Sequence, residues 1–403
     1  MRISTQSFYE QSQAAMSTQQ ANLLRVQQQI GANTKILSPS DDPIAATRAL
    51  ATAQAISLNG QYASSRNQVK QTLSLEGNIL DSVTNIYNNI KSLVVQGGNG
   101  SLSDSDRASI ATTLQSNYDQ LLGLANTADG NGQFIFAGFQ SGTPPFVKQA
   151  DGTVAFVGDQ GQRLMQVDAS RQMAATDDGR AIFQSVQGGA RYVTSSPATN
   201  NGTAVFGSSA VTDATDVNFG KDFSISFSGG KYTVTTISTP PEEVATGAFV
   251  DGAPITFGGV QISVKGTPSD GDTMNVSTAK NAGSDIFSAL GDVIAALRKP
   301  IDNGTSADRT QLLNSLSTVN VKLANSLDNV LTVSASVGSR LNEVDALDDS
   351  GSARNISDQS YLSDLQDLDV VKASVELAQR QVSLQATQLA FMKIQKISLM
   401  NYL

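Results

Sequence analysis

The C-terminal stretch, residues 368–403, constrains the fold of this chain more than any other part of its sequence. It holds neither Gly nor Pro, and its apolar residues recur in steps of three and four. A repeat of about 3.5 residues keeps one stripe of a helix facing a partner helix, as in a coiled coil. We expect an assembly interface along this stripe and the chain end that continues it, at Leu368, Val371, Val375, Val382, Leu389, Met392, Leu399 and Leu403.

A second apolar stripe lies beside the first in the sequence pattern, at Val370, Leu377, Leu384 and Phe391. Two neighbouring stripes make a wide apolar face, which suits a helix bundle better than a two-stranded coil. We therefore add Leu384 and Phe391 to the expected interface. A helix with this much apolar surface must be covered, and its covering partner is the main question that the sequence raises.

The N-terminal segment shows a weaker form of the same repeat. Residues 1–37 carry few charges, and their apolar heptad positions alternate with Gln or Thr. Ordering the backbone costs about 1–2 kcal/mol per residue, so this segment buries too little to fold alone. It is either a disordered tail or one half of a coiled coil whose other half is the C-terminal stripe. In the second interpretation its interface residues are Met16, Leu23, Ile30 and Leu37, and Pro39 ends the helix.

Helix signals follow this segment, and short strands come after them. Asp42 before Pro43 predicts the start of a long helix that Gly97–Gly100 ends. Ser103 with Asp106 predicts a capping box at the start of the next helix. The period then changes, and strands are predicted at 133–137, 153–157 and 163–167.

Residues 191–280 have the pattern of β structure throughout. Alternating apolar residues on both sides of Gly229-Gly230 and of Gly258-Gly259 predict two tight hairpins. Helices return at Ser284 and Thr305. We expect Asp348–Gly351 to loosen the second of these before the C-terminal helix.

The order of these elements predicts a mainly α fold with a β insertion. The N- and C-terminal segments would form a long antiparallel helical coiled coil or bundle, with a small all-β domain at its far end. The expected divisions are an N-terminal coiled-coil segment (1–42), a helical rod with β hairpins (43–190), a β-rich outer domain (191–280), a returning helical rod (281–355) and a C-terminal coiled-coil segment (356–403).

Composition argues against most other functions. The chain has 27 Lys and Arg against 36 Asp and Glu, without a basic cluster, which argues against a nucleic-acid partner. It has no His and no Cys, so the usual catalytic triads and metal sites of nitrogen or sulfur ligands cannot form. Asp129–Gly132 and Ser269–Asp272 resemble calcium loops but lack the downstream bidentate Glu, so we expect turns there. We expect no enzymatic activity, no cofactor and no metal.

The sequence also lacks the marks of two targeting routes. Its first residues have no apolar core of a secretory signal, and no run approaches the ~18 apolar residues of a membrane span. We expect no membrane partner, and export, if it occurs, without a cleaved signal.

Four stretches of the chain resemble the flagellin superfamily of bacterial flagella. Ile36–Pro43 looks like the turn between the first two helices of that family, and Asp104–Arg107 opens a third helix as in flagellins. Gly132–Gly138, followed by Thr143–Phe146, and the ending Ser398–Leu403 are similar to the members that join hook and filament.

The resemblance covers roughly 1–140 and 283–403. Gln115 or Ser116 stands where flagellins often have a Glu, so no role of that carboxylate is carried over. Residues 191–280 lie outside this resemblance.

The resemblance implies an extracellular structural protein of the flagellum, exported by the flagellar type III route without a cleaved signal peptide. It implies helical, head-to-tail assembly through the terminal helices. The implied partners are further copies of the chain in a ring or helical oligomer, hook-associated protein 1, flagellin, and a flagellar export chaperone that binds the C-terminal helix. Two alternatives remain, a filament flagellin and an unrelated adhesive or phage tail fibre. The simplest alternative for the heptads is packing within one subunit.

We predict that both chain ends are largely unfolded in the free monomer and order on assembly. Circular dichroism of the full-length monomer should then show little more helix than a fragment of residues 43–360. Extra helix in proportion to the added residues would contradict this prediction.

Overall fold

The computed structural model describes residues 5–400, with side chains for residues 9–393. The chain forms two compact units, which are described separately below. The terminal unit combines residues 1–64 with 346–403, and the central unit is residues 65–345. The finer division into five segments stays a prediction.

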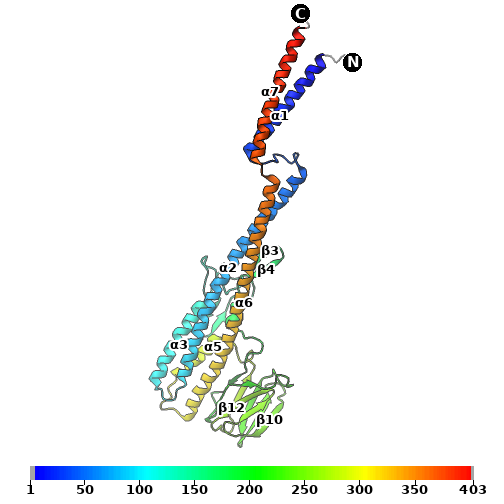
Figure 1. The fold of residues 1–403 in the computed structure, drawn as a ribbon. Helices are drawn as coiled ribbons and strands as arrows, with labels where there is room; N and C mark the ends of the chain where they lie inside the picture. Colours follow the sequence, from blue (N-terminus) through cyan, green and yellow to red (C-terminus); the bar gives the residue numbers. More distant parts are fainter. Residues whose placement is uncertain (1–4, 401–403) are drawn as a thin grey trace. The chain divides into compact units, whose positions relative to one another are not determined.

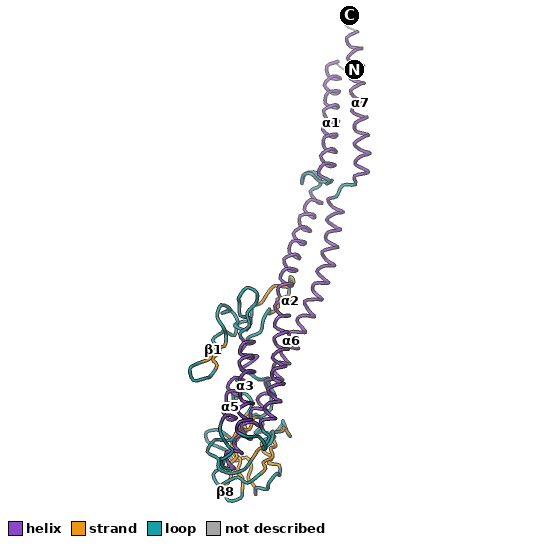
Figure 2. The backbone as a smooth tube through the Cα atoms, turned by 90° about the vertical axis from the view of Figure 1, so that its left-hand side faces the viewer, coloured by secondary structure: helices purple, strands orange, loops and turns teal. Residues whose placement is uncertain are grey.

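Two helices from opposite ends of the sequence make up most of the terminal unit. They are α1 (Thr5–Ala32) and α7 (Val370–Met400). They pack against each other, and Figure 1 and Figure 2 show them side by side in two views. The first part of α2 (Pro43–Gly97) and the last part of α6 (Ser306–Gln366) complete the unit. The predicted pairing of the N- and C-terminal helices is confirmed.

The first helix ends earlier than predicted. Asn33 has a φ of 51°, a left-handed conformation that stops α1 after Ala32 rather than at Pro39. Leu37 therefore lies in the loop that follows. The backbone N–H of Lys35 donates to the carbonyl of Gln366 at 2.8 Å, so this loop lies against the end of α6.

The predicted loosening at Asp348–Gly351 is wrong, because α6 runs through it without a break. Packing supports the helix there: the Gly351 carbonyl accepts a hydrogen bond from the Asn59 side chain at 2.7 Å. This contact outweighs the weak helix propensity of Asp, Ser and Gly. The helix α6 ends instead at Gln366. Leu368 lies in the break between α6 and α7.

The start of α2 follows the sequence prediction. Asp42 Oδ1 accepts the backbone N–H groups of Ile44 and Ala45 at 3.1 and 2.9 Å, and Pro43 is the first helical residue. Asp42 thus satisfies two of the backbone donors that a helix start leaves without partners.

In the central unit, α2 and α6 are joined by α3 (Asp104–Ala125) and α5 (Ile286–Arg298), which pack on each other (Figure 1). The residues of one heptad stripe of α2 are all buried. They are Val69, Leu73, Glu76, Leu80, Val83, Tyr87, Ile90 and Val94. Burial of such apolar stripes supplies the core of this unit.

The predicted capping box at the start of α3 is present, with Ser103 and Asp106 as its members. A cluster of hydrogen bonds and ion pairs lies beside this capping box. Asp104 accepts the N–H of Ile301 at 2.8 Å, Asp302 accepts the N–H of Asp104 at 2.9 Å, and the Arg107 side chain contacts both carboxylates. The α2–α3 and α5–α6 turns are thereby held together.

Short elements follow α3. They are β1 (Phe146–Lys148), β2 (Val154–Phe156), β3 (Leu164–Asp168), β4 (Arg171–Ala174) and α4 (Gly179–Phe183). The strands predicted at 153–157 and 163–167 are confirmed. The strand predicted at 133–137 is wrong, because only Phe134 forms an isolated bridge there. Ile135, Phe136 and Ala137 are all buried, so this run enters the core instead of alternating between two faces.

The β domain lies between α4 and α5 in the sequence. Its strands are β5 (Val193–Ser195), β6 (Val205–Phe206), β7 (Ala210–Val211), β8 (Phe223–Ser228), β9 (Lys231–Thr236), β10 (Glu243–Ala248), β11 (Pro254–Phe257), β12 (Val260–Lys265) and β13 (Thr273–Ser277). The five-stranded sheet has the order β10-β9-β8-β13-β5, and the second sheet is built on β11-β12-β6 with β7 beside β12.

Both predicted hairpins of the β domain are confirmed. Gly229 and Gly230 connect β8 to β9 with φ values of 57° and 71°, and Gly258 and Gly259 connect β11 to β12 with 50° and 73°. Two successive positive φ values are typical of the turn that matches strand twist. The apolar faces of both sheets share one buried core, which includes Phe223 and Ile262.

A row of polar residues on α6 holds the chain segment 181–206, which leads into the β domain. Asn314 bonds the Ala204 carbonyl and the Phe206 N–H, and Asn325 bonds both backbone groups of Arg191. Asn329 donates to the carbonyls of residues 181, 182 and 185 at 2.7, 2.9 and 3.2 Å. We call Asn314, Asn325 and Asn329 the amide ladder.

We predict that Asn329→Ala lowers the free energy of unfolding of the full chain by about 2–4 kcal/mol, because it leaves buried carbonyls without donors. Urea denaturation measures this. Asn342→Ala is the matched control, since Asn342 is exposed on the same helix, and it should change stability by less than about 0.5 kcal/mol. Equal effects of the two substitutions would contradict the role given to Asn329.

Candidate assembly interface

The contact between α1 and α7 is a narrow seam. On α1 it follows Met16, Leu23, Val26 and Ile30, and on α7 it follows Ala373, Leu377, Leu384 and Phe391. Of these eight residues only Val26 and Ala373 are buried, each 5 % exposed, and the others are half-buried.

Aromatic and polar residues complete the seam. The rings of Tyr9 and Phe391 lie 5.2 Å apart. On α1, Ser12, Gln19 and Val26 occupy the intermediate positions, while Gln13, Gln20 and Gln27 are exposed. The sequence prediction of Gln at these seam positions is therefore wrong by one residue. On α7 the seam also includes Arg380, which donates to Glu376 on its own helix at 3.1 Å.

The main apolar stripe of α7 faces away from α1. Val371 is 77 % exposed, Val375 and Val382 are each 65 % exposed, Leu389 is 57 % and Met392 is 50 % exposed. At 3.6 residues per turn, this stripe lies roughly 160° around the helix from the seam. The two stripes of α7 therefore do not form one wide face. One covers α1 and the other is open.

The terminal unit has almost no buried core of its own. Among the side chains that the structure describes there, Val26, Ala49 and Ala373 are the only buried apolar ones. Large apolar residues are exposed on its other helices as well, at Leu24, Ile44, Leu50, Leu58, Ile356 and Tyr361. Exposed apolar surface of this extent is typical of a site of protein–protein contact.

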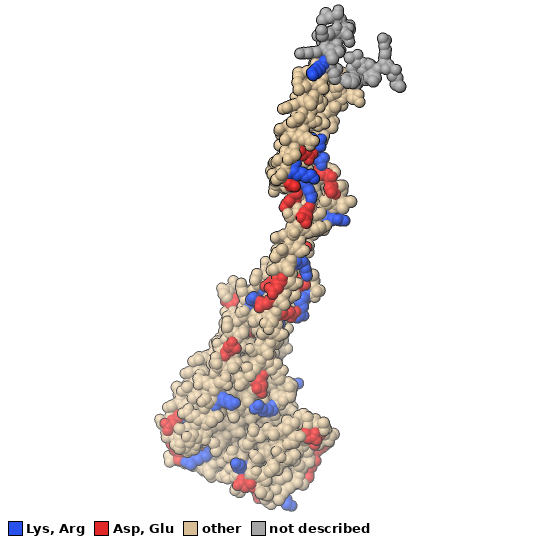
Figure 3. All heavy atoms as spheres, in the orientation of Figure 1, with Lys and Arg blue, Asp and Glu red and all other residues tan. Residues whose placement is uncertain are grey.

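Charges in the terminal unit gather near the helix breaks. Arg25 forms an ion pair with Asp41 at 3.0 Å, and Lys35 donates to the Asp364 carbonyl. The backbone N–H groups of Ser38 and Leu37 hold the pKa of Asp41 below its usual value. On the face drawn in Figure 3, the charged side chains lie near these breaks, and most of the α1–α7 pair is uncharged.

A hollow of about 240 Å³ lies beside this loop in the terminal unit. Ile36, Leu37 and Pro39 form one side of it, and Ala49, Leu50 and Ala53 of α2 line the other. Leu37, a predicted interface residue, is 37 % exposed at its edge. The hollow adds an indented surface with apolar walls to the terminal unit.

The predicted interface residues thus fall into three groups. Met16, Leu23, Ile30, Leu384 and Phe391 are half-buried between α1 and α7. Val371, Val375, Val382, Leu389 and Met392 form the open stripe, and Leu37 and Leu368 lie in the two breaks. The side chain of Leu399 and all of Leu403 lie outside the described residues.

Sequence reasoning missed the exposed residues of α2 and α6 in the terminal unit. Ile44, Leu50 and Leu58 are not spaced as a heptad stripe, and Ile356 is isolated in a polar stretch. The sequence offered one signal for them: they are apolar residues on helices that have no matching apolar stripe there to cover them. Val26 was missed too, although it lies three residues after Leu23 and four before Ile30.

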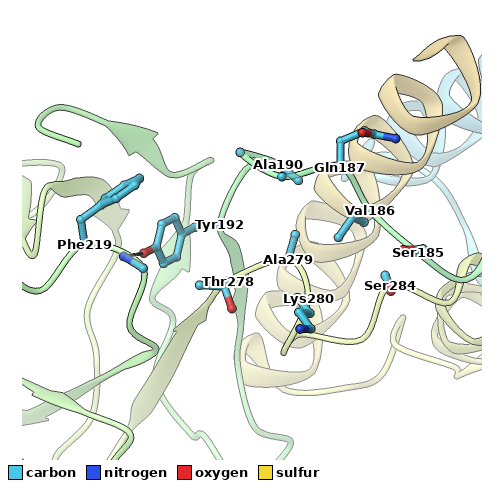
Figure 4. Close-up of a pocket in the computed structure, with 13 residues that line it drawn as sticks. Ser185, Val186, Gln187, Ala190, Tyr192, Phe219, Thr278, Ala279, Lys280 and Ser284 are labelled. Atoms are coloured by element: carbon cyan, nitrogen blue, oxygen red, sulfur yellow. Dashed lines mark hydrogen bonds between the residues drawn. The ribbon is translucent and has the colours of Figure 1, made fainter. Parts of the chain in front are cut away.

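Figure 4 shows a cavity of about 500 Å³ in the central unit, where both connections to the β domain pass. Tyr192 and Phe219 lie on its β-domain side, with Ser185 and Ser284 at the other end. The Tyr192 hydroxyl already accepts the N–H of Gly220 at 2.6 Å. The cavity lies where the chain enters and leaves the β domain.

No helix within residues 5–400 is both long enough and apolar enough to cross a bilayer. In the same described part of the chain, no three acidic side chains come together as a group able to hold a metal ion.

Two family models match the chain. The model described as bacterial flagellin N-terminal helical region matches residues 3–141. The model described as flagellar hook-associated protein 1, D2-like domain, matches residues 195–278. This second match gives a relative to the β domain, for which sequence reasoning had named none.

Known proteins resemble the chain over nearly its whole length. Flagellar hook-associated protein 3 of Escherichia coli is 32 % identical over 399 residues, which are 99 % of this chain and 98 % of that protein. The protein of the same name from Salmonella typhimurium is 31 % identical over the same shares of both chains. The crystal structure of flagellar hook-associated protein 3 from Legionella pneumophila has a TM-score of 0.69 at 26 % identity, over 78 % of this chain and 98 % of that one.

These relatives are structural proteins of the flagellum and not enzymes. The likeness in sequence extends over nearly the whole chain, including the terminal helices and the inserted β domain. The chain belongs to the flagellar hook-associated protein 3 family.

Proposed function

We propose that this chain is a structural subunit of the junction between the flagellar hook and the flagellin filament. The observation that supports this most directly is the open apolar stripe of α7 in a unit with almost no buried core. A protein that keeps such a surface needs neighbouring subunits to cover it. Family membership points to the flagellum as the place where those subunits are found.

Burial of apolar side chains gives assembly through the terminal helices its energetic basis. Fully burying a Val, Leu or Met side chain stabilises by about 1.5–3 kcal/mol relative to leaving it exposed. The five residues of the open stripe together can therefore offset a large part of the roughly 4–15 kcal/mol that association costs in lost freedom of motion. In the head-to-tail assembly proposed here, the contacts are heterologous and join the stripe of α7 to a different surface of the next subunit.

The proposed neighbours are further copies of this chain in a ring or helical oligomer, hook-associated protein 1 on the side of the hook, and flagellin on the side of the filament. The likeness of residues 195–278 to a domain of hook-associated protein 1 supports a subunit built on a related plan. The likeness of residues 3–141 to flagellin supports the same for the helical part.

We further propose that the subunit is exported unfolded by the flagellar type III route, with a chaperone on its C-terminal helix, and without a cleaved signal peptide. The small core of the terminal unit supports this, because little buried surface has to be lost when it unfolds. A chaperone would cover the open stripe of α7 until assembly. In this proposal the assembled protein lies outside the cell, in the flagellum.

We predict that Val382→Asp prevents assembly without destabilising the monomer. Val382 is 65 % exposed, so its replacement should change the free energy of unfolding by less than about 0.5 kcal/mol. A strain that carries only this variant should lose most of its swimming and release flagellin into the medium. Gln381→Asp is the matched control, since Gln381 is exposed on the same helix and is not three or four residues from any member of the stripe. Normal swimming with Val382→Asp would contradict the interface.

Immunogold labelling of isolated flagella tests the location. We predict one narrow band at the distal end of the hook, and a deletion strain that is non-motile and releases flagellin. Labelling along the whole filament, with long filaments formed by the purified chain alone, would favour a filament flagellin instead. Absence of label from flagella, with normal motility of the deletion strain, would favour an adhesive or phage tail fibre.

A further inference from the structure

Glu76 is a carboxyl group in an unusual place for a structural helix. It lies on the buried seam of α2 between Leu73 and Leu80 and is 0 % exposed. Within the described part of the chain, neither of its carboxyl oxygens has a hydrogen-bond partner of ordinary geometry. An ionised carboxylate in such a site is strongly destabilised unless it is paired, so its proton matters to the fold.

Two charged groups act on Glu76, one from each element that packs against this part of α2. Asp177 comes from the segment between β4 and α4, and Arg340 comes from α6. Arg340 is already paired: its Nη2 donates to Asp177 Oδ2, and its Nη1 donates to the Ala174 carbonyl at 3.1 Å. Both side chains are largely buried, at 13 % and 16 % exposed.

Several side-chain contacts attach residues 162–178, the segment that includes Asp177, to the helices. Gln162 reaches Asp177 Oδ1 from the chain before β3, at 3.3 Å. Two further ion pairs fasten the helices and the β3–β4 hairpin, Arg171 with Glu343 at 2.5 Å and Lys70 with Asp345 at 2.6 Å. The side chains of these two pairs are 38–54 % exposed, so water stabilises their charges independently of Glu76.

We propose that Glu76, Asp177 and Arg340 form a proton-controlled switch in which Arg340 has two alternative carboxylate partners. While Glu76 is neutral, Arg340 stays with Asp177 and holds residues 162–178 against α2 and α6. When Glu76 loses its proton, the buried charge draws Arg340 toward itself and repels Asp177. The segment 162–178 then loses its contact and opens.

Burial first, and the Asp177 carboxylate second, raise the pKa of Glu76 to about 8, while Arg340 opposes this rise. The pKa in the folded chain thus lies above that of an unfolded glutamate, about 4.3. Between these values the folded chain binds more protons than the unfolded one. Stability is therefore highest at the acidic side of this window and falls as pH rises toward 8.

The test measures the full chain and the variant Glu76→Gln, which keeps the shape of the side chain without its charge. Hydrogen exchange of residues 162–178, corrected for intrinsic rates, should accelerate at least about tenfold between pH 6 and pH 9 in the unaltered chain. In Glu76→Gln the corrected rate should stay constant across this range. The urea concentration at the midpoint of unfolding should fall over the same pH range in the unaltered chain and stay constant in Glu76→Gln.

Glu343→Gln is the matched control, because Glu343 is a partly exposed glutamate on α6 whose pKa is lowered by its bond to Arg171. In Glu343→Gln, hydrogen exchange of residues 162–178 should still accelerate between pH 6 and pH 9. A second variant, Asp177→Asn, removes the carboxylate through which Arg340 holds the segment, so exchange of residues 162–178 should already be fast at pH 6. A constant rate in the unaltered chain, or an unchanged acceleration in Glu76→Gln, would overturn the proposal. None of these measurements requires assembly, so they are independent of the proposed function.

Discussion

A pair of helices can bury only the faces that they turn toward each other. In the terminal unit, α1 offers a thin stripe with Ser and Gln between its apolar residues, and α7 meets it with its less apolar face. The more apolar face of α7 is left over. This mismatch between two stripes on one helix and a single partner within the chain is the constraint that points from fold to assembly. It also explains why the terminal unit shows so few buried residues beside so many exposed apolar ones.

The central unit solves the same problem differently, since all of its long helices have partners within the chain. The seam of α2 is buried from Val69 to Val94, and the turns at the helix ends are fixed by Asp104, Asp302 and Arg107. The one member of that seam that departs from apolar chemistry is Glu76. A single carboxyl among Leu and Val side chains makes an otherwise ordinary core sensitive to protons.

Periodicity and capping residues were enough to predict the long helices and both Gly-Gly hairpins, because each depends on local geometry. Asp42 and Ser103 marked helix starts correctly for that reason. The pairing of the two chain ends was predicted differently, from the similar repeats at both ends. Some errors arose where distant contacts decide. Asn59 supports the helix at Gly351, and the run from Ile135 to Ala137 is buried by partners that no local pattern reveals. The early end of α1 has a local cause instead, the left-handed φ of Asn33, which the heptad pattern did not indicate. For the interface, the heptads identified both stripes of α7, but only the structure distinguishes the one that meets α1 from the one that stays open.

The amide ladder of α6 has a consequence for how such chains can vary. Asn314 and Asn325 bond only main-chain atoms of the segment they hold, and Asn329 adds to its main-chain bonds a single side-chain partner, Gln187. Main-chain atoms are the same in every sequence, so the ladder imposes almost no requirement on the side chains of that segment. Mutations can accumulate along the inserted module, and whole modules can be exchanged during evolution, while three asparagines on one helix keep the graft point unchanged.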